Sequence, residues 1–440
     1  MTDLFAARSQ MAMALAFHIV FAAIGMAMPL LMVLAEAAYL RTGDPVFRVL
    51  AKKWSKGVSM LFAIGAVSGT VLSFELGLLW PEFMRFAGPI VGMPFSLEGF
   101  AFFLEAIFLG IWLYAWDRVR ASLHLLAGVG VLVSGLLSAV FVICANGWMN
   151  TPTGFVMKGG EVVSIDPIAA MFNPSALPEG IHMVAAAFAA VGFFVAGVHA
   201  WYVLRSPTDP FHRRALSIAM IVATLGAFTT PATAHFTAQA VAKNQPVKLA
   251  AMEARWETGA WAPFTIGGVP DEVAEETHYK LEIPGLLSVL SFDDPNAVVQ
   301  GLKDFPKDER PPVWPVHAAF QLMIACGLAM MAVAGLFTAR AAWLRALPVD
   351  RPLLWGIVAC APLGFIAIEA GWVVTEVGRQ PWVVTGFLRT ADAVTPQSGL
   401  WLHLLGFTGL YVLLGLVVAR LMVQLVDSTD PTTHGHGGKP

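Results

Sequence analysis

Charged residues are scarce in this chain. They make up 13% of its 440 residues, whereas an ordinary soluble domain carries about 25%, so the composition argues against a soluble enzyme. The net charge of −3 leaves no excess of Lys and Arg to contact phosphate, which argues against a nucleic-acid partner. The three cysteines form neither a CxxC pair nor a CxxCH motif, which excludes a disulfide framework and covalent haem attachment.

Hydrophobic residues take the place of the missing charges. They account for 57% of the chain and recur in runs of about 20 residues, long enough to cross about 30 Å of hydrocarbon as α-helix. The first run lacks a clear cleavage site after a basic start, so we interpret it as a retained span rather than a signal peptide. The sequence therefore predicts an all-α, polytopic membrane bundle of about nine transmembrane helices, at residues 11–39, 57–80, 97–115, 124–146, 180–204, 216–240, 316–338, 353–377 and 400–424.

Basic residues alternate between the connections that join these runs. The first, third, fifth and seventh connections are rich in Lys and Arg, whereas the short even-numbered connections carry one or two each. Because basic connections stay on the cytoplasmic side, we expect the N-terminus outside and the C-terminus inside. Four regions follow: spans one to six at 1–240, an external acidic loop at 241–315, spans seven to nine at 316–424, and a disordered cytoplasmic tail at 425–440.

Ionisable side chains inside the apolar runs are the first functional signal, because each costs at least about 2.5–3.5 kcal/mol to insert. Glu98 and Glu105 lie seven residues apart, as do Glu369 and Glu376. Seven residues return to nearly the same helix face, so each pair forms a carboxylate ladder suited to a proton relay. Structural polar contacts with neighbouring helices are the alternative. The whole set comprises His18, Glu36, Glu75, Glu98, Glu105, His182, His199, Glu369, Glu376 and His403.

Four possible axial ligands of haem iron fall in the outer half of the predicted spans. They are His18, His182, Met323 and Glu376. Haem iron takes His, and a His/Met pair suits electron transfer. Single ligands on separate helices are what a haem bundle needs, because the macrocycle is large and planar. A buried His that only packs, and a Met that only fills the core, are the alternatives.

Several segments resemble subunit I of the cytochrome bd-type quinol oxidases. They are GWVVTEVGRQPW at 371–382, SLEGFAFFLEAIFLGIWLYAWDR at 96–118, KLAAMEARWET at 248–258 and ANGWMNTP at 145–152. The likeness runs from the first span to the ninth, and FELGLLWPEF with the overall length is more similar to the cyanide-insensitive branch, with its short quinol loop.

This resemblance implies a terminal oxidase of the bacterial cell membrane that oxidises quinol outside and reduces dioxygen to water with protons from inside. It implies three haems: a low-spin haem b, a high-spin haem b, and haem d or a further haem b. Lipid would surround the chain. A related subunit II is expected as partner, and a small single-helix subunit stays open.

The resemblance also implies roles for individual residues. His182 and Met323 match the ligands of the low-spin haem, and His18 and Glu376 those of the high-spin pair. Glu98 and Glu105 match proton-path carboxylates, with Ser138 and Asn146 as polar positions along it. Glu253 and Lys248 match quinol-loop residues, a base and an orienting group. Arg379 and Trp382 would support haem propionates or stack. One departure is Gln321, where some relatives carry Arg.

Two other functions compete with this interpretation. A secondary transporter would show internal repeats and interrupted helices, and no repeat between the halves is apparent. A haem b membrane anchor that only passes electrons would need His/His pairs, and it would not explain Glu376 or the Glu98–Glu105 ladder.

Overall fold

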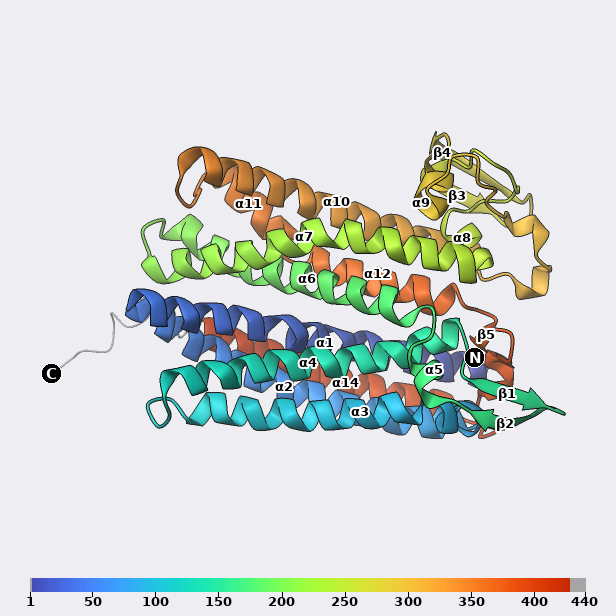
Figure 1. Ribbon diagram of the computed structural model, residues 1–440, viewed down its shortest axis with the longest axis horizontal. Coiled ribbons are helices and arrows are strands. Elements are labelled where there is room, and N and C mark those ends of the chain that lie inside the picture. Colours follow the sequence, from blue (N-terminus) through green and yellow to red (C-terminus); the bar gives the residue numbers. More distant parts are fainter. Residues whose placement is uncertain (1, 428–440) are drawn as a thin grey trace.

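The computed structural model describes residues 2–427 and is an elongated bundle of long helices (Figure 1). Within those residues, nine helical segments are long and apolar enough to cross a membrane, which confirms the predicted class. They are α1 (Asp3–Thr42), α2 (Pro45–Leu79), α3 (Pro81–Tyr114), α4 (Ala121–Asn150), α6 (Ala176–Arg205), α7 (Pro210–Asn244), α10 (Val313–Leu344), the broken pair α11 (Arg351–Cys360) and α12 (Leu363–Val377), and α14 (Leu400–Asp427).

Short elements fill the connections at one end of the bundle. They are β1 (Phe155–Lys158), β2 (Glu161–Ile165), α5 (Pro167–Met171), α8 (Pro246–Met252), β3 (Phe264–Asp271), β4 (Glu276–Ile283), α9 (Leu286–Phe292), β5 (Trp382–Val384), β6 (Leu388–Arg389) and α13 (Thr390–Ala393). The strands form three separate antiparallel hairpins, so the all-α prediction holds for the spans but not for their connections. We call this end, which also holds the start of α1, the loop end (Figure 1).

The helix starts follow local sequence signals. Pro45 and Pro210 each occupy a first helical position, where a missing N–H costs nothing, and the preceding Asp44 and Asp209 accept backbone N–H groups of the first turn. Asp3 has a longer reach: its Oδ1 accepts the N–H groups of Gly399 and Leu400 at 3.0 and 2.9 Å. The first helix therefore caps the last.

The helices extend beyond several of the predicted spans. The spans expected at 57–80 and 97–115 begin earlier, at Pro45 and Pro81, and α3 continues through two internal prolines. The span expected at 216–240 is one helix, α7, which runs from Pro210 to Asn244 through Pro231. The hydroxyls of Thr230 and Thr233, beside this proline, bond to carbonyls of the preceding turn.

The predicted loop at 241–315 and the predicted tail at 425–440 both contain regular secondary structure. The 241–315 loop is folded: α7 runs on to Asn244, and α8, a hairpin and α9 follow. At the other end, α14 extends to Asp427, so the first residues of the expected tail are helical. The rest of that tail, 428–440, lies outside the described residues.

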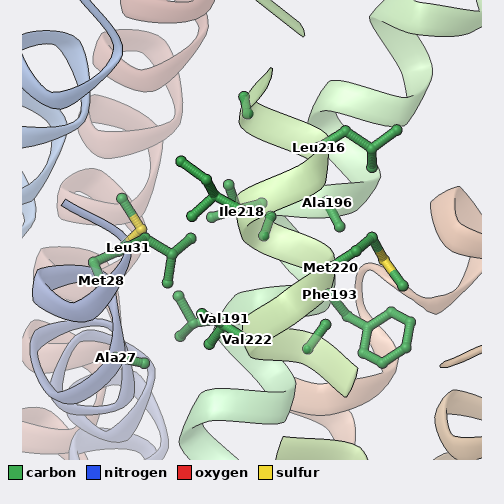
Figure 2. Close-up of a cluster of buried hydrophobic side chains, with 14 of the residues drawn as sticks. Ala27, Met28, Leu31, Val191, Phe193, Ala196, Leu216, Ile218, Met220 and Val222 are labelled. Atoms are coloured by element: carbon green, nitrogen blue, oxygen red, sulfur yellow. The ribbon is translucent and has the colours of Figure 1, made fainter. Parts of the chain in front are cut away.

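Small residues let the central helices approach closely. Figure 2 shows Met28 and Leu31 of α1 facing Val191 of α6 and Val222 of α7 across the main core. A Cβ on Gly226 would lie 2.4 Å from the backbone N of Ala189, and one on Gly192 would lie 2.5 Å from that of Ala223. This backbone-to-backbone packing of α6 on α7 is typical of membrane helices and fixes the frame that carries His182.

Candidate functional site

His18 lies on α1 with one ring nitrogen bonded to a neighbouring helix. Its Nδ1 is 3.0 Å from the Ser68 hydroxyl of α2. A Cβ on Gly69 would lie 3.0 Å from the His18 ring, so only glycine gives the imidazole this much room. An imidazole whose second nitrogen is fixed by a hydrogen bond is the usual form of a metal-binding histidine.

His182 repeats this arrangement on α6. Its Nδ1 is 3.1 Å from the Thr233 hydroxyl of α7. Met323, its expected partner, lies on α10, where its sulfur would be 3.3 Å from a Cβ on Gly371 of α12. Helices α7 and α12 each pack against both α6 and α10, so the two candidate ligands stand on helices that share two flanking walls.

Glu376 stands at the centre of a polar cluster near the end of α12. One oxygen accepts from Asn146 Nδ2 at 2.6 Å, and the other pairs with Arg379 at 2.5 Å. The buried Asn150 extends the cluster: its Oδ1 accepts from Lys248 Nζ at 2.8 Å, and its Nδ2 donates to Glu179 at 3.2 Å. Two carboxylates and two basic groups thus balance in charge.

Asn150 and Glu179 were not predicted as site residues. Asn150 lies in the segment ANGWMNTP. Glu179 lies in the first turn of α6, three residues before His182. That spacing, which brings Glu179 onto the same turn as a candidate ligand, is the one signal that the sequence offered.

The predicted Glu98–Glu105 ladder faces α4. Glu98 accepts from the Ser138 hydroxyl at 3.1 Å. Glu105 is buried against two glycines: a Cβ on Gly135 would lie 3.2 Å from its carboxyl, and one on Gly25 would lie 3.7 Å away. Ser138 also shares a helix face with Asn146. One face of α4 thus touches both the ladder and the Glu376 cluster.

Glu253 is enclosed in the folded loop. It is 1% exposed, its Oε2 accepts the Thr265 N–H at 2.8 Å, and its Oε1 is buried without a partner among the described residues. Burial raises the pKa of Glu253 to about 8, partly offset by the Thr265 N–H and by Arg255.

Lys248 is also buried, and burial lowers its pKa to about 7 while Glu179 acts in the opposite direction. The two residues predicted for the quinol loop therefore have different hydrogen-bond partners. Glu253 bonds to β3, and Lys248 bonds to the Glu376 cluster.

The remaining predicted residues have local partners. Trp382 lies in β5 with the Arg389 guanidinium 5.1 Å from its ring centre. Arg379 is buried, and its Nε bonds no group in the described part of the chain, which leaves one donor for an anionic group. Gln321 bonds to the backbone of β3 at Thr265 and Gly267.

Other intramembrane ionisable residues bond to polar side chains of neighbouring helices, which is the structural alternative to a functional role. Glu36 bonds to His124 at 2.8 Å, Glu75 to Gln10 at 3.0 Å, and His199 to His212 at 2.9 Å.

The donors present fit iron held in a porphyrin. Across residues 2–427 no group of three or more His, Cys, Asp or Glu side chains could form a metal cage, whereas a porphyrin supplies four nitrogen ligands and needs only one or two from protein. Two histidines with Nδ1 held by a hydroxyl, a thioether beside a glycine and a spare Arg379 donor meet that need.

These features are those of a multi-pass membrane protein with candidate haem ligands on separate helices. The description "Cytochrome bd terminal oxidase subunit I" matches residues 6–430, so the chain belongs to that family. It is 35% identical to a Bacillus subtilis (strain 168) protein named as a cytochrome bd menaquinol oxidase subunit I, over 96% of each chain. It is 31% identical to the cytochrome bd ubiquinol oxidase subunit 1 of the same organism, over 96% of this chain and 93% of that one.

A solved structure agrees with the sequence comparisons. The bd oxidase of Geobacillus thermodenitrificans superimposes with a TM-score of 0.92 at 37% identity, covering 98% of this chain and 99% of that one. Family membership excludes the secondary transporter and the simple haem b anchor that the sequence left open, and it makes haem and quinol the ligands of this fold.

Proposed function

We propose that this chain oxidises quinol at its loop end and delivers the electrons to dioxygen through a low-spin haem b and two high-spin haems. The arrangement of His18 and His182, each with Nδ1 bonded to a hydroxyl of a neighbouring helix, carries this proposal. His182 and Met323 would hold the low-spin haem. His18 and Glu376 would hold the high-spin pair, haem b with haem d or with a further haem b. The haems, when bound, supply one-electron transfer and the reduction of dioxygen.

The protein's own part at the quinol site is proton removal. Glu253 Oε1 is the atom we assign to this step, because it is the carboxyl oxygen that no described group bonds and a general base needs a free acceptor. Lys248 would act from the opposite side, through Asn150 and the Glu376 cluster. Since Glu253 is buried, a quinol reaches it only when the loop opens.

Protons for oxygen reduction would travel along α3 and α4. Glu105 and Glu98 lie on α3, and Glu98 accepts a hydrogen bond from Ser138 of α4. Farther along α4, Asn146 bonds to Glu376. Arg379 Nε remains available for a haem propionate, since a guanidinium–carboxylate pair is strong in such a setting.

Exposed apolar helix faces support the proposed partners and location. Within the chain, 6% of the most apolar stretch of α14 is buried, against 56% of that of α6. Helix α3 exposes Phe100, Phe103 and Ile107. We propose that these faces meet subunit II, a small single-helix subunit and lipid in a bacterial cell membrane, with the loop end outside.

The purified complex of this chain with its subunit II tests the function. We expect a reduced-minus-oxidised spectrum with low-spin and high-spin bands, extraction of haem, and quinol-dependent oxygen uptake. A colourless complex, or one with low-spin haem alone, contradicts the assignment. Pigment extraction identifies haem d.

Single cysteines test the orientation. Val273→Cys lies on the loop end and Arg118→Cys at the opposite end, both exposed, while Cys144, Cys326 and Cys360 are buried. In intact cells an impermeant maleimide should label only the first. Labelling of Arg118→Cys alone would reverse the orientation.

A further inference from the structure

Two side chains of α10 hold the quinol loop onto the bundle. Gln321 Oε1 accepts the Gly267 N–H at 3.0 Å, and its Nε2 donates to the Thr265 carbonyl at 2.9 Å. One turn earlier, His317 contacts two backbone carbonyls: Nε2 lies 2.9 Å from Gly267 O, and Nδ1 lies 2.8 Å from Met252 O. The amide of Gln321 was predicted only as a departure from relatives, and His317 was not predicted at all.

Both contacts of His317 end on backbone carbonyls, which only accept hydrogen bonds. A ring nitrogen that bonds to one of them therefore donates its N–H. The side chain is 1% exposed, so these carbonyls of two other segments are its hydrogen-bond partners.

Both carbonyls lead directly to Glu253. Met252 precedes it in the chain, and Gly267 follows Thr265 in β3 by two residues. The Thr265 N–H is the donor to Glu253 Oε2. His317 thus fixes the backbone on both sides of this carboxyl, and the bonds that it makes leave Oε1 as the free oxygen.

We propose that His317 is a positioning residue for quinol oxidation that holds Glu253 in place through Met252 and β3. The proposal rests on the role given above to Glu253. It also joins two parts of the reaction: His317 precedes Met323 by six residues on α10, about 9 Å of helix rise, so the proton acceptor is anchored on the helix that carries an expected haem ligand.

Four variants of the purified complex test this role: His317→Leu, His317→Gln, Glu253→Gln and the double variant with His317→Leu and Glu253→Gln. The control His278→Leu changes an exposed histidine of the same hairpin, in β4. We expect His317→Leu to lower kcat/KM for quinol at least tenfold and His317→Gln, which keeps an amide donor, to lower it less. The His278→Leu control should match the unmodified protein.

The double variant separates positioning from a general structural effect. If His317 acts through Glu253, the double variant loses no more activity than Glu253→Gln alone. Oxygen uptake with an artificial one-electron donor that bypasses the quinol site should remain unchanged, as should the low-spin haem spectrum.

Three outcomes overturn the proposal: unchanged kcat/KM in His317→Leu, losses that multiply in the double variant, or a loss of the low-spin band in His317→Gln. If His317→Leu fails to assemble, His317→Gln alone and combined with Glu253→Gln gives the same comparison. If Glu253→Gln itself retains full quinol oxidation, the role of Glu253 is refuted, and that result is distinct from a failure of His317 alone.

Discussion

With Glu253 as the proposed base, its buried carboxyl predicts how the quinol reaction depends on pH. Burial raises its pKa to about 8, and a base acts only when deprotonated. The deprotonated, active form therefore approaches completeness only well above pH 8 and is lost as the pH falls through that value. The ionised fraction is about 1% at pH 6, about 9% at pH 7 and about half at pH 8. We therefore expect kcat/KM for quinol to rise about tenfold from pH 6 to 7 and about fivefold from pH 7 to 8.

Oxygen uptake by the purified complex, at subsaturating quinol from pH 6 to 9, measures this profile. Glu253→Gln should be at least about 100-fold slower at pH 9, the usual contribution of a general base, and its profile should lose the rise. Lys248→Met serves as the control for the second buried group, whose pKa is about 7: it should keep the rising limb. A rise that persists in Glu253→Gln, or activity that falls with increasing pH in the unmodified complex, refutes the reasoning.

The remaining predictions concern the haem ligands, the proton path and helix packing. His182→Ala should remove the low-spin band from the reduced-minus-oxidised spectrum, and an intact band would reject the ligand assignment. Glu105→Gln should slow quinol-dependent turnover at least about 100-fold, the lower end of the range for lost proton transfer, with near-normal haem content; unchanged turnover would exclude it from the path. Gly364→Val should lower the free energy of unfolding by at least about 1–3 kcal/mol, because a Cβ there would lie 2.2 Å from Ala190 Cα. Gly409→Val, with open space around it, is the control in thermal inactivation, and equal half-lives would contradict the packing argument.

The spans were predictable because hydrophobicity is a local property. Nine apolar runs gave nine spans, and single ionisable residues within them marked the candidate ligands. Helix ends were less accessible to prediction, because α3 continues through two prolines and α7 through one. Composition alone did not reveal that a long acidic connection folds into a hairpin and helices.

The polar contacts of the site depend on distant parts of the chain. Asn146 and Glu376 are 230 residues apart, and Lys248 reaches Asn150 across 98 residues. No spacing rule relates such positions, so the sequence placed Lys248 beside Glu253, whereas the fold directs their side chains to different partners. His317 was missed for the same reason: its importance comes from two carbonyls of other segments.

The cap that Asp3 provides for α14 joins two spans that are far apart in the chain. The Asp3 carboxylate can make these bonds only after Gly399 and Leu400, nearly 400 residues later, have been synthesised. Closure of the bundle is therefore a late, post-insertion event. A bulky fusion placed directly before Asp3 would obstruct docking of the ninth span while leaving the earlier ones free to insert.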